Sequence, residues 1–255
     1  MNCRVCRGAV EHLGQDVVLG RHDAEYVRCK DCGSVAVVDP TWLDEAYMDA
    51  IASTDVGLVS RCVSTATCVA VLARTARLNG PFLDYGAGEG LMVRLLRNRG
   101  LDFRWFDPMA HNRYAVGLEA EPGQHCSMIT AVEVVEHLLD PVQTLRELAE
   151  AGDVLFLSTY LVPEPAPPPG TWWYYSPETG QHITFLSERG LRRVAEELGL
   201  HLASRGDLHV LSRRRLPLRS RFLSLRPRLA AIWADLHRWP TLTPGDHTDA
   251  VERRN

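Results

Sequence analysis

The chain has 255 residues, of which 45% are hydrophobic and 24% are charged. This composition is that of an ordinary globular protein and excludes wholesale disorder, collagen-like repeats and a coiled coil. The net charge is −4, and seven arginines without an acidic residue fall between 213 and 228. The rest of the chain is therefore acidic, which weakens any diffuse attraction to nucleic acid or anionic lipid. Without an 18-residue apolar run or an apolar leader after Met1, we expect no membrane span and a cytoplasmic location.

Two pairs of cysteines share the spacing Cys-x-x-Cys: Cys3 with Cys6, and Cys29 with Cys32. Each pair places two thiolates on one tight turn, and two such turns complete the tetrahedral sulfur shell that zinc prefers. The sequence therefore predicts a structural Zn²⁺ held by all four. The alternative is two disulfides in a secreted domain, which the missing leader disfavours. We expect the remaining cysteines to be small buried apolar side chains: Cys62, Cys68 and Cys126.

The N-terminal third divides into two predicted parts. Residues 1–40 predict a zinc ribbon, and residues 41–79 predict connecting helices. The ribbon strands are expected at 16–19 and 34–38. The helices are expected over 41–52, which is acidic, and over 55–79, which has one buried face.

Beyond Gly80 the pattern changes to short apolar strands that alternate with helices. Strands are expected at 82–85, 103–106, 127–132 and 154–157, and helices at 91–99, 141–151 and 187–199. A closing hairpin is expected from 200–203 and 208–211. Over residues 80–212 this alternation predicts an α/β fold: a Rossmann-like, doubly wound, mostly parallel sheet that binds ligands at the carboxyl ends of its strands. Residues 213–255 predict an Arg-rich C-terminal appendage.

A glycine-rich turn joins the strand 82–85 to the next helix. It reads Asp-Tyr-Gly-Ala-Gly-Glu-Gly from Asp84 to Gly90, and its glycines permit a tight turn and close approach of a ligand. The spacing differs from the Gly-x-Gly-x-x-Gly of dinucleotide sites. We expect Asp84 to bind an ammonium group and Asp107, at the end of the next strand, to bind a ribose. One ammonium and one ribose without a pyrophosphate describe S-adenosylmethionine. The alternative is a turn that only packs a helix on a strand.

With these residues the chain resembles the class I S-adenosylmethionine-dependent methyltransferases. The segment from Glu133 to Pro141 reads Glu-Val-Val-Glu-His-Leu-Leu-Asp-Pro. It is similar to a segment of one branch that includes ubiquinone-type O-methyltransferases and sugar methyltransferases. The resemblance covers about 80–211 and implies a methyltransferase that uses S-adenosylmethionine. It implies these cofactor-binding residues: Asp84, Gly86, Ala87, Gly88, Asp107 and Ala131.

Two features depart from the family. Only 19 residues separate Asp107 from Ser127, so one strand–helix unit is abbreviated. Ser127 also stands where the family has an aspartate at the start of a strand. Both departures fall where the family binds adenine.

Two histidines are the candidate catalytic bases. Methyl transfer needs a positioned acceptor and often a group that removes its proton. His137 and His182 suit this role because imidazole titrates near neutral pH, while the alternative for His137 is a structural role beside Glu136. The resemblance to ubiquinone-type enzymes also implies a divalent ion at Glu133, Glu136 and His137, although hard ions usually take more oxygen ligands.

An aromatic run precedes His182. Clustered rings beside an amide suit stacking on a sugar or ring and hydrogen bonding to its hydroxyls. We therefore predict that these residues bind the methyl acceptor: Trp172, Trp173, Tyr174, Tyr175 and Gln181. The alternative is that the rings cover the core beneath the proline-rich loop 163–169.

The sequence thus predicts a zinc-ribbon methyltransferase that methylates oxygen or carbon of a small hydroxylated acceptor, such as a sugar, a nucleotide sugar or a specialised metabolite. Two other functions stay open. An RNA methyltransferase would use the ribbon and the arginines of 213–228, because Arg matches phosphate oxygens. A non-enzymatic scaffold would keep the cofactor fold without methyl transfer. The same arginines otherwise form a solvated face, contact a nucleotide-diphosphate carrier, or dock on a second copy in a homo-oligomer.

Overall fold

A computed structural model describes residues 1–48 and 55–253. The chain forms two compact units, and each is built from segments far apart in the sequence. Unit 1 consists of Met1–Ala52, Val132–Glu150 and Leu157–Arg213, and unit 2 consists of Ser53–Ala131, Ala151–Phe156 and Arg214–Asn255. The division predicted from the sequence, into 1–40, 41–79, 80–212 and 213–255, stays a prediction.

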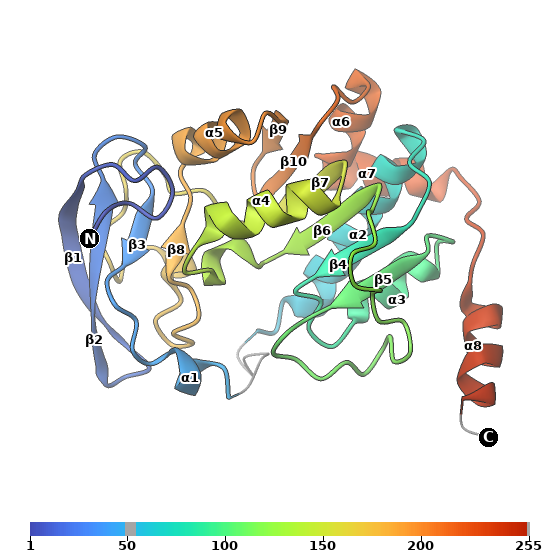
Figure 1. Ribbon diagram of the computed structural model, residues 1–255, viewed down its shortest axis with the longest axis horizontal. Coiled ribbons are helices and arrows are strands. Elements are labelled where there is room, and N and C mark those ends of the chain that lie inside the picture. Colours follow the sequence, from blue (N-terminus) through green and yellow to red (C-terminus); the bar gives the residue numbers. More distant parts are fainter. Residues whose placement is uncertain (49–54, 254–255) are drawn as a thin grey trace. The chain divides into compact units, whose positions relative to one another are not determined.

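The N-terminal sheet lies in unit 1 and has the strand order β1-β2-β3-β8, with every pairing antiparallel (Figure 1). Its strands are β1 Val10–Val18, β2 His22–Cys29, β3 Val35–Val37 and β8 Thr184–Phe185. The first strand is longer than the predicted 16–19, and β2 is additional to the prediction. Many side chains of β1 and β2 are exposed, so neither strand contains the continuous apolar run that marks a buried strand.

Aromatic side chains form the core beneath this sheet. Tyr26, Trp42, Tyr175 and Phe185 belong to one buried cluster and are at most 4% exposed. The rings of Tyr26 and Tyr175 lie 5.1 Å apart, and those of Tyr175 and Phe185 lie 4.9 Å apart and edge to face. Each such side chain contributes roughly 1.5–3 kcal/mol by leaving water. This core joins the N-terminal strands to the segment 174–185.

The second sheet confirms the predicted doubly wound α/β architecture. Its strand order is β5-β4-β6-β7-β10-β9. Strand β4 pairs in parallel with β5 and β6, while β9 and β10 form the predicted antiparallel hairpin. The strands are β4 Phe82–Tyr85, β5 Phe103–Phe106, β6 Met128–Val132, β7 Val154–Ser158, β9 His201–Arg205 and β10 Leu208–Ser212.

Local capping signals place the helices that follow the strands. The Asp140 carboxylate accepts a hydrogen bond from the Gln143 N–H at 3.1 Å, and the Ser187 hydroxyl accepts one from the Gly190 N–H at 2.9 Å. Both are N-caps that satisfy a free backbone donor. The helices are α1 Leu43–Ala46, α2 Leu58–Thr75, α3 Leu91–Arg97, α4 Pro141–Ala151, α5 Glu188–Glu197, α6 Leu218–Ser224, α7 Pro227–Asp235 and α8 Thr243–Glu252. Of the predicted helix 41–52, residues 49–52 lie outside the described residues.

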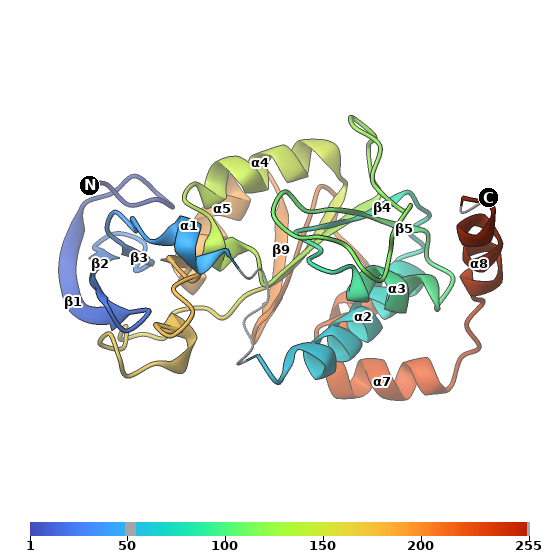
Figure 2. The ribbon, with the colours of Figure 1, turned by 90° about the horizontal axis from the view of Figure 1, so that it is seen from below.

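The C-terminal helices are part of the core of unit 2. Both α6 and α7 pack against α2, and Figure 2 shows α7 alongside it. All residues from Thr65 to Ala73 are therefore buried, in place of the single buried face that was expected. Among the described helices, α2 alone is long and apolar enough to cross a membrane, with a mean hydropathy of 1.2. Half of it is buried in the protein, which is the pattern of a core helix.

The three remaining cysteines are consistent with small apolar side chains. Cys68 and Cys126 are buried, and Cys62 is half-buried.

Candidate functional site

The glycine-rich turn of unit 2 adopts a conformation that requires glycine. Gly86, Gly88 and Gly90 have φ angles of 70°, 54° and 81°, in the left-handed region that side chains disfavour. The Gly86 N–H donates to the Phe106 carbonyl at 2.8 Å and ties the turn to the end of β5. Apart from Gly88 itself and its two chain neighbours, no atom of the described structure lies within 4 Å of the position that a Cβ of Gly88 would take. The turn, which includes Ala87, thus leaves room for a ligand against its backbone.

Asp107 organises the loop that faces this turn. One carboxylate oxygen accepts the Gly88 N–H at 2.8 Å, and the other accepts the N–H groups of Met109 and Ala110, each at 2.8 Å. The predicted ribose-binding acid therefore also joins the two loops by three hydrogen bonds.

Asp84 is a buried carboxyl at the end of β4, only 3% exposed. The Thr130 hydroxyl donates to it at 2.6 Å. Burial raises the pKa of Asp84 to about 7, with a further contribution from the charge of Asp107 and against the effect of the Thr130 hydrogen bond. Such a carboxyl favours a bound cation, because the cation restores the charged form. Ala131, next to Thr130, is 1% exposed in β6.

The Glu-His segment of unit 1 brings together three predicted site residues. Ligand atoms of Glu136, His137 and His182 lie within 4.8 Å of one another, and the two imidazole rings are 4.9 Å apart and perpendicular. The Tyr47 hydroxyl lies 3.0 Å from Nδ1 of His137. Burial, followed by the neighbouring His182, lowers the pKa of His137 to about 3. His137 is therefore neutral at physiological pH.

A carbonyl determines the tautomer of His182. Nδ1 of His182 lies 2.7 Å from the Tyr174 carbonyl oxygen. A carbonyl only accepts, so Nδ1 carries the proton, and Nε2 of the neutral ring carries the lone pair. The ring is thereby oriented with its basic nitrogen on the opposite side from the Tyr174 carbonyl.

Glu133 lies outside this cluster. The cluster therefore differs from the predicted ion site, which contained Glu133. The group within metal-binding distance contains His182 in place of Glu133. Glu133 has a φ angle of 54°, and its carboxylate accepts a hydrogen bond from the Ser158 hydroxyl at 2.7 Å. Its N–H also donates to the Ser158 carbonyl at 2.9 Å. A non-glycine residue in the left-handed region is uncommon and persists only where the surroundings hold it.

The five predicted acceptor-binding residues differ in their exposure. Tyr174 and Tyr175 are each 1% exposed, whereas Trp173 is 65% exposed. The Tyr174 hydroxyl donates to the Glu136 carboxylate, Trp172 packs against the aromatic core, and the Gln181 amide donates to the Ala46 carbonyl at 2.8 Å. Trp173 is thus the one of the five whose ring is mainly open to solvent.

The four paired cysteines converge on one point in unit 1. Their sulfur atoms lie within 4.8 Å of one another, with 3.7 Å between Cys3 and Cys32 and 3.4 Å between Cys6 and Cys29. These separations suit a tetrahedron with Zn–S bonds of about 2.3 Å, and they exceed the S–S bond length of about 2.05 Å. The described cysteines are all free, so the disulfide alternative was wrong.

Backbone donors complete the sulfur cluster. The Val5 N–H points to Sγ of Cys3 at 3.3 Å, and the Cys32 N–H points to Sγ of Cys29 at 3.4 Å. Such donors stabilise negative charge on sulfur and orient the ligands of a metal. The residues present therefore fit a structural zinc ion.

Several partners of these residues were not found from the sequence. Tyr47, Thr130 and Ser158 each contact a predicted site residue. Tyr47 precedes His137 by 90 positions, and no local pattern signals such a contact.

The fold and the glycine-rich turn define a class I methyltransferase. Residues 65–205, more than half of the chain, match the family described as "Methyltransferase domain". The chain belongs to this family and is an S-adenosylmethionine-dependent methyltransferase. No curated protein sequence matches the chain.

Solved structures share the fold at low sequence identity. The magnesium protoporphyrin IX methyltransferase of Synechocystis PCC 6803 with bound S-adenosylhomocysteine is 16% identical, with 68% of this chain and 94% of that chain covered and a TM-score of 0.43. A complex of the Trm112 methyltransferase activator with a putative methyltransferase from Haloferax volcanii gives 18% identity, 67% and 98% coverage, and a TM-score of 0.50. The plantazolicin methyltransferase BpumL gives 12% identity, 79% and 88% coverage, and a TM-score of 0.46. At these identities the likeness concerns the fold alone.

Proposed function

We propose that the protein methylates a hydroxyl group of a small molecule and that His182 is the general base. The observation that carries this proposal is the tautomer of His182, whose Nδ1–H is held by the Tyr174 carbonyl. Nε2 of the neutral ring therefore carries the lone pair that a general base uses. The acceptor class that suits a cluster of polar and aromatic side chains is a sugar, a nucleotide sugar or a specialised metabolite.

The glycine-rich turn and the strand ends beside it hold the methyl donor in this proposal. Asp84 binds the ammonium group, Asp107 binds the ribose, and the backbone from Gly86 to Gly88 lies against the ligand, beside Ala131. When bound, S-adenosylmethionine supplies a methyl group on a positively charged sulfur, which leaves as a neutral thioether once the acceptor has taken the methyl. The fit rests on the buried Asp84 carboxyl, with its raised pKa, and on the space beside Gly88.

His182 acts as the base. The acceptor hydroxyl transfers its proton to Nε2 of His182, and the Tyr174 carbonyl stabilises the resulting imidazolium through Nδ1–H. The neighbouring His137 is neutral because burial lowers its pKa to about 3, so it adds no repulsive positive charge. Glu136 adds a carboxylate within 4.8 Å of both rings. Trp173 offers an exposed ring for stacking on the acceptor.

A second role is supported by the same side chains. Glu136, His137 and His182 would also hold a divalent ion, since two imidazoles and one carboxylate are a common set of metal ligands. Such an ion would supply Lewis-acid activation of the acceptor hydroxyl, and activity should then fall when a chelator removes it. Chelation at constant pH therefore separates the two roles, provided that the four-cysteine zinc stays bound.

Acceptor labelling tests the proposal. We expect the purified protein to transfer a tritiated methyl group to a member of a panel of nucleotide sugars, sugars and hydroxylated aromatic compounds. His182→Asn keeps a donor to the Tyr174 carbonyl but has no basic nitrogen, so kcat should fall about 10²–10⁴-fold. His201→Asn, on an exposed strand position, is the matched control with unchanged kcat. If the tritiated methyl group appears in total RNA instead, the result supports an RNA methyltransferase. Cofactor binding without any labelled acceptor would support a non-enzymatic scaffold.

The remaining parts of the proposal concern zinc and location. We propose that the four-cysteine zinc is structural, because four thiolates leave no open coordination position. We also propose a cytoplasmic location, where thiols stay reduced.

A further inference from the structure

The connection between β5 and β6 lacks the helix that such a connection usually contains. Both strands are parallel to β4 and flank it, so the chain crosses over β4 between them. Such a crossover usually carries a helix. Residues 107–127 are all described, and this stretch contains no helix. An irregular segment of this kind needs other contacts to hold its backbone, because it forms few hydrogen bonds with itself.

The segment is held first by the glycine-rich turn. The N–H groups of Arg113 and Tyr114 both donate to the Glu89 carbonyl, at 3.0 and 2.9 Å. The Asn112 side chain lies against Gly90, within 2.2 Å of the position that a Cβ there would take. The position of this segment and that of the proposed cofactor-binding turn are therefore linked directly.

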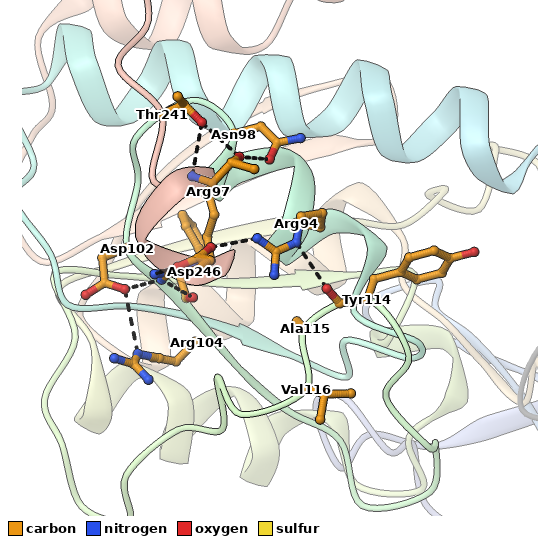
Figure 3. A network of polar contacts seen from close by, with 12 residues as sticks. Arg94, Arg97, Asn98, Asp102, Arg104, Tyr114, Ala115, Val116, Thr241 and Asp246 are labelled. Atoms are coloured by element: carbon orange, nitrogen blue, oxygen red, sulfur yellow. Dashed lines mark hydrogen bonds and ion pairs between the residues drawn. The ribbon is translucent and has the colours of Figure 1, made fainter. Parts of the chain in front are cut away.

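Arg94 of α3 also holds this segment. Its Nε donates to the Tyr114 carbonyl at 3.1 Å, and its Nη1 donates to the Asp246 carboxylate of α8 at 2.6 Å (Figure 3). One guanidinium thus joins three parts of unit 2: the helix after the glycine-rich turn, the irregular segment and the C-terminal helix. Arg253, at the end of α8, also donates to the Val116 carbonyl at 3.4 Å.

Asp246 is itself held by a second arginine. Arg97 donates to both oxygens of the Asp246 carboxylate, at 2.8 and 2.7 Å. The Arg97 side chain is 7% exposed and that of Asp246 is 8% exposed. The Arg97 guanidinium, with a smaller contribution from Arg94, lowers the pKa of Asp246 against the effect of burial. A two-pronged arginine–carboxylate pair of this geometry is strong and orients both groups.

We propose that α8 replaces the missing crossover helix and that Arg94 and Asp246 are positioning residues for cofactor binding. The order of contacts is Asp246 to Arg94, Arg94 to the Tyr114 carbonyl, and the Tyr114 N–H to the Glu89 carbonyl in the glycine-rich turn. Neither side chain is proposed to touch the cofactor. They hold the segment that follows Asp107 in the place where it supports the bound ligand. This inference rests on the proposed cofactor site.

Arg94→Met is the sharpest test, because it keeps the apolar stem and leaves the Arg97–Asp246 pair to hold α8. We expect the Kd for S-adenosylhomocysteine, measured by calorimetry well below the melting temperature, to rise about tenfold, the usual effect of losing a charged hydrogen bond. The KM for S-adenosylmethionine should rise with kcat unchanged at saturation. Hydrogen exchange at the amides of 113 and 114 should become faster in the ligand-free protein.

The controls separate positioning from general stability. Arg104→Met removes another arginine of the same network, one that pairs with the Asp102 carboxylate at 3.6 Å, and should change none of these values. Asp246→Asn should act in the same direction as Arg94→Met and also lower the melting temperature. Wild-type affinity and unchanged exchange in Arg94→Met would overturn the inference. If the wild-type protein binds no S-adenosylhomocysteine, the proposed cofactor site fails instead, while the exchange comparison still tests the link between α8 and the segment.

Discussion

The buried Asp84 carboxyl makes cofactor binding depend on pH. Its pKa is raised to about 7 in the ligand-free protein, so about nine-tenths of the molecules are protonated there at pH 6 and about one-tenth at pH 8. A ligand ammonium group binds the carboxylate form. We therefore expect the affinity for S-adenosylhomocysteine to rise about tenfold from pH 6 to pH 8. Binding at pH 6 should release close to one proton per ligand.

The raised pKa of Asp84 has the opposite consequence for folding stability, which decreases as the pH rises. The pKa of Asp84 is raised from 3.8 to about 7, so between these pH values the folded protein binds more protons than the unfolded chain. Its contribution to the free energy of unfolding therefore falls as pH rises, by about 4 kcal/mol in total at 1.36 kcal/mol per pKa unit. Asp84→Asn removes this cost. The variant should melt roughly 8–16 °C higher than wild type at pH 8, show little change at pH 4, and no longer bind the ligand.

Calorimetry in buffers of different ionisation enthalpy measures the released protons directly. Thr130→Val is the matched variant, because it removes the hydroxyl that donates to Asp84 at 2.6 Å and keeps the shape of the side chain. The loss of this hydrogen bond should move the midpoint of the pH dependence up by about one unit, the equivalent of roughly 1.4 kcal/mol. An affinity that is constant from pH 6 to 8, with no proton released in wild type, would refute the reasoning.

Three further predictions concern unit 1. Protein purified under reducing conditions should contain one zinc ion per chain by metal analysis. Cys29→Ser should lower both the zinc content and the melting temperature, because metal binding contributes several kcal/mol of folding free energy. A metal-free protein whose melting temperature does not change with chelators would contradict this. Ser187→Ala should lower the free energy of unfolding by about 1–2 kcal/mol in denaturant titrations, because the hydroxyl caps α5 and also donates to the Cys32 carbonyl. An unchanged midpoint of denaturant unfolding would show that neither contact contributes to stability. Trp173→Ala should change the free energy of unfolding by no more than about 0.5 kcal/mol and raise the KM for the acceptor. Tyr175→Ala, in the buried core, should lower the free energy of unfolding by about 3–5 kcal/mol. Equal effects of the two substitutions on stability would contradict the difference in burial.

Local patterns predicted the elements that carry the cofactor argument. The apolar strand, the glycines from Gly86 to Gly90 and the following helix are neighbours in sequence, so their geometry follows from local rules for turns and helix starts. The N-caps Asp140 and Ser187 were predictable for the same reason. The four cysteines were predictable because their spacing alone reveals two metal-binding turns.

Contacts between distant segments were not predictable from one sequence. Strand β8 has only two residues, Thr184 and Phe185, too few for a periodic pattern, and its partner is β3. The sequence predicts an Arg-rich appendage at 213–255 and carries no signal of burial there. Ser220 and Ser224 are nevertheless fully buried, on the helix α6 that packs against α2. Small side chains let helices approach closely, but a serine carries no local signal of burial.

The pairing of β3 with β8 determines when the N-terminal sheet is able to finish folding during synthesis. Val35 pairs with Phe185, and at about 5–20 residues per second a ribosome needs roughly 8–30 s to make the chain between them. Until then Tyr26, Val35 and Val37 have Trp42 close by in the sequence but lack Tyr174, Tyr175 and Phe185, the other aromatic members of their buried cluster. A ribbon cut off after residue 40 would lack both β8 and these aromatic side chains, so we expect the metal module to need the later half of the chain to complete its fold.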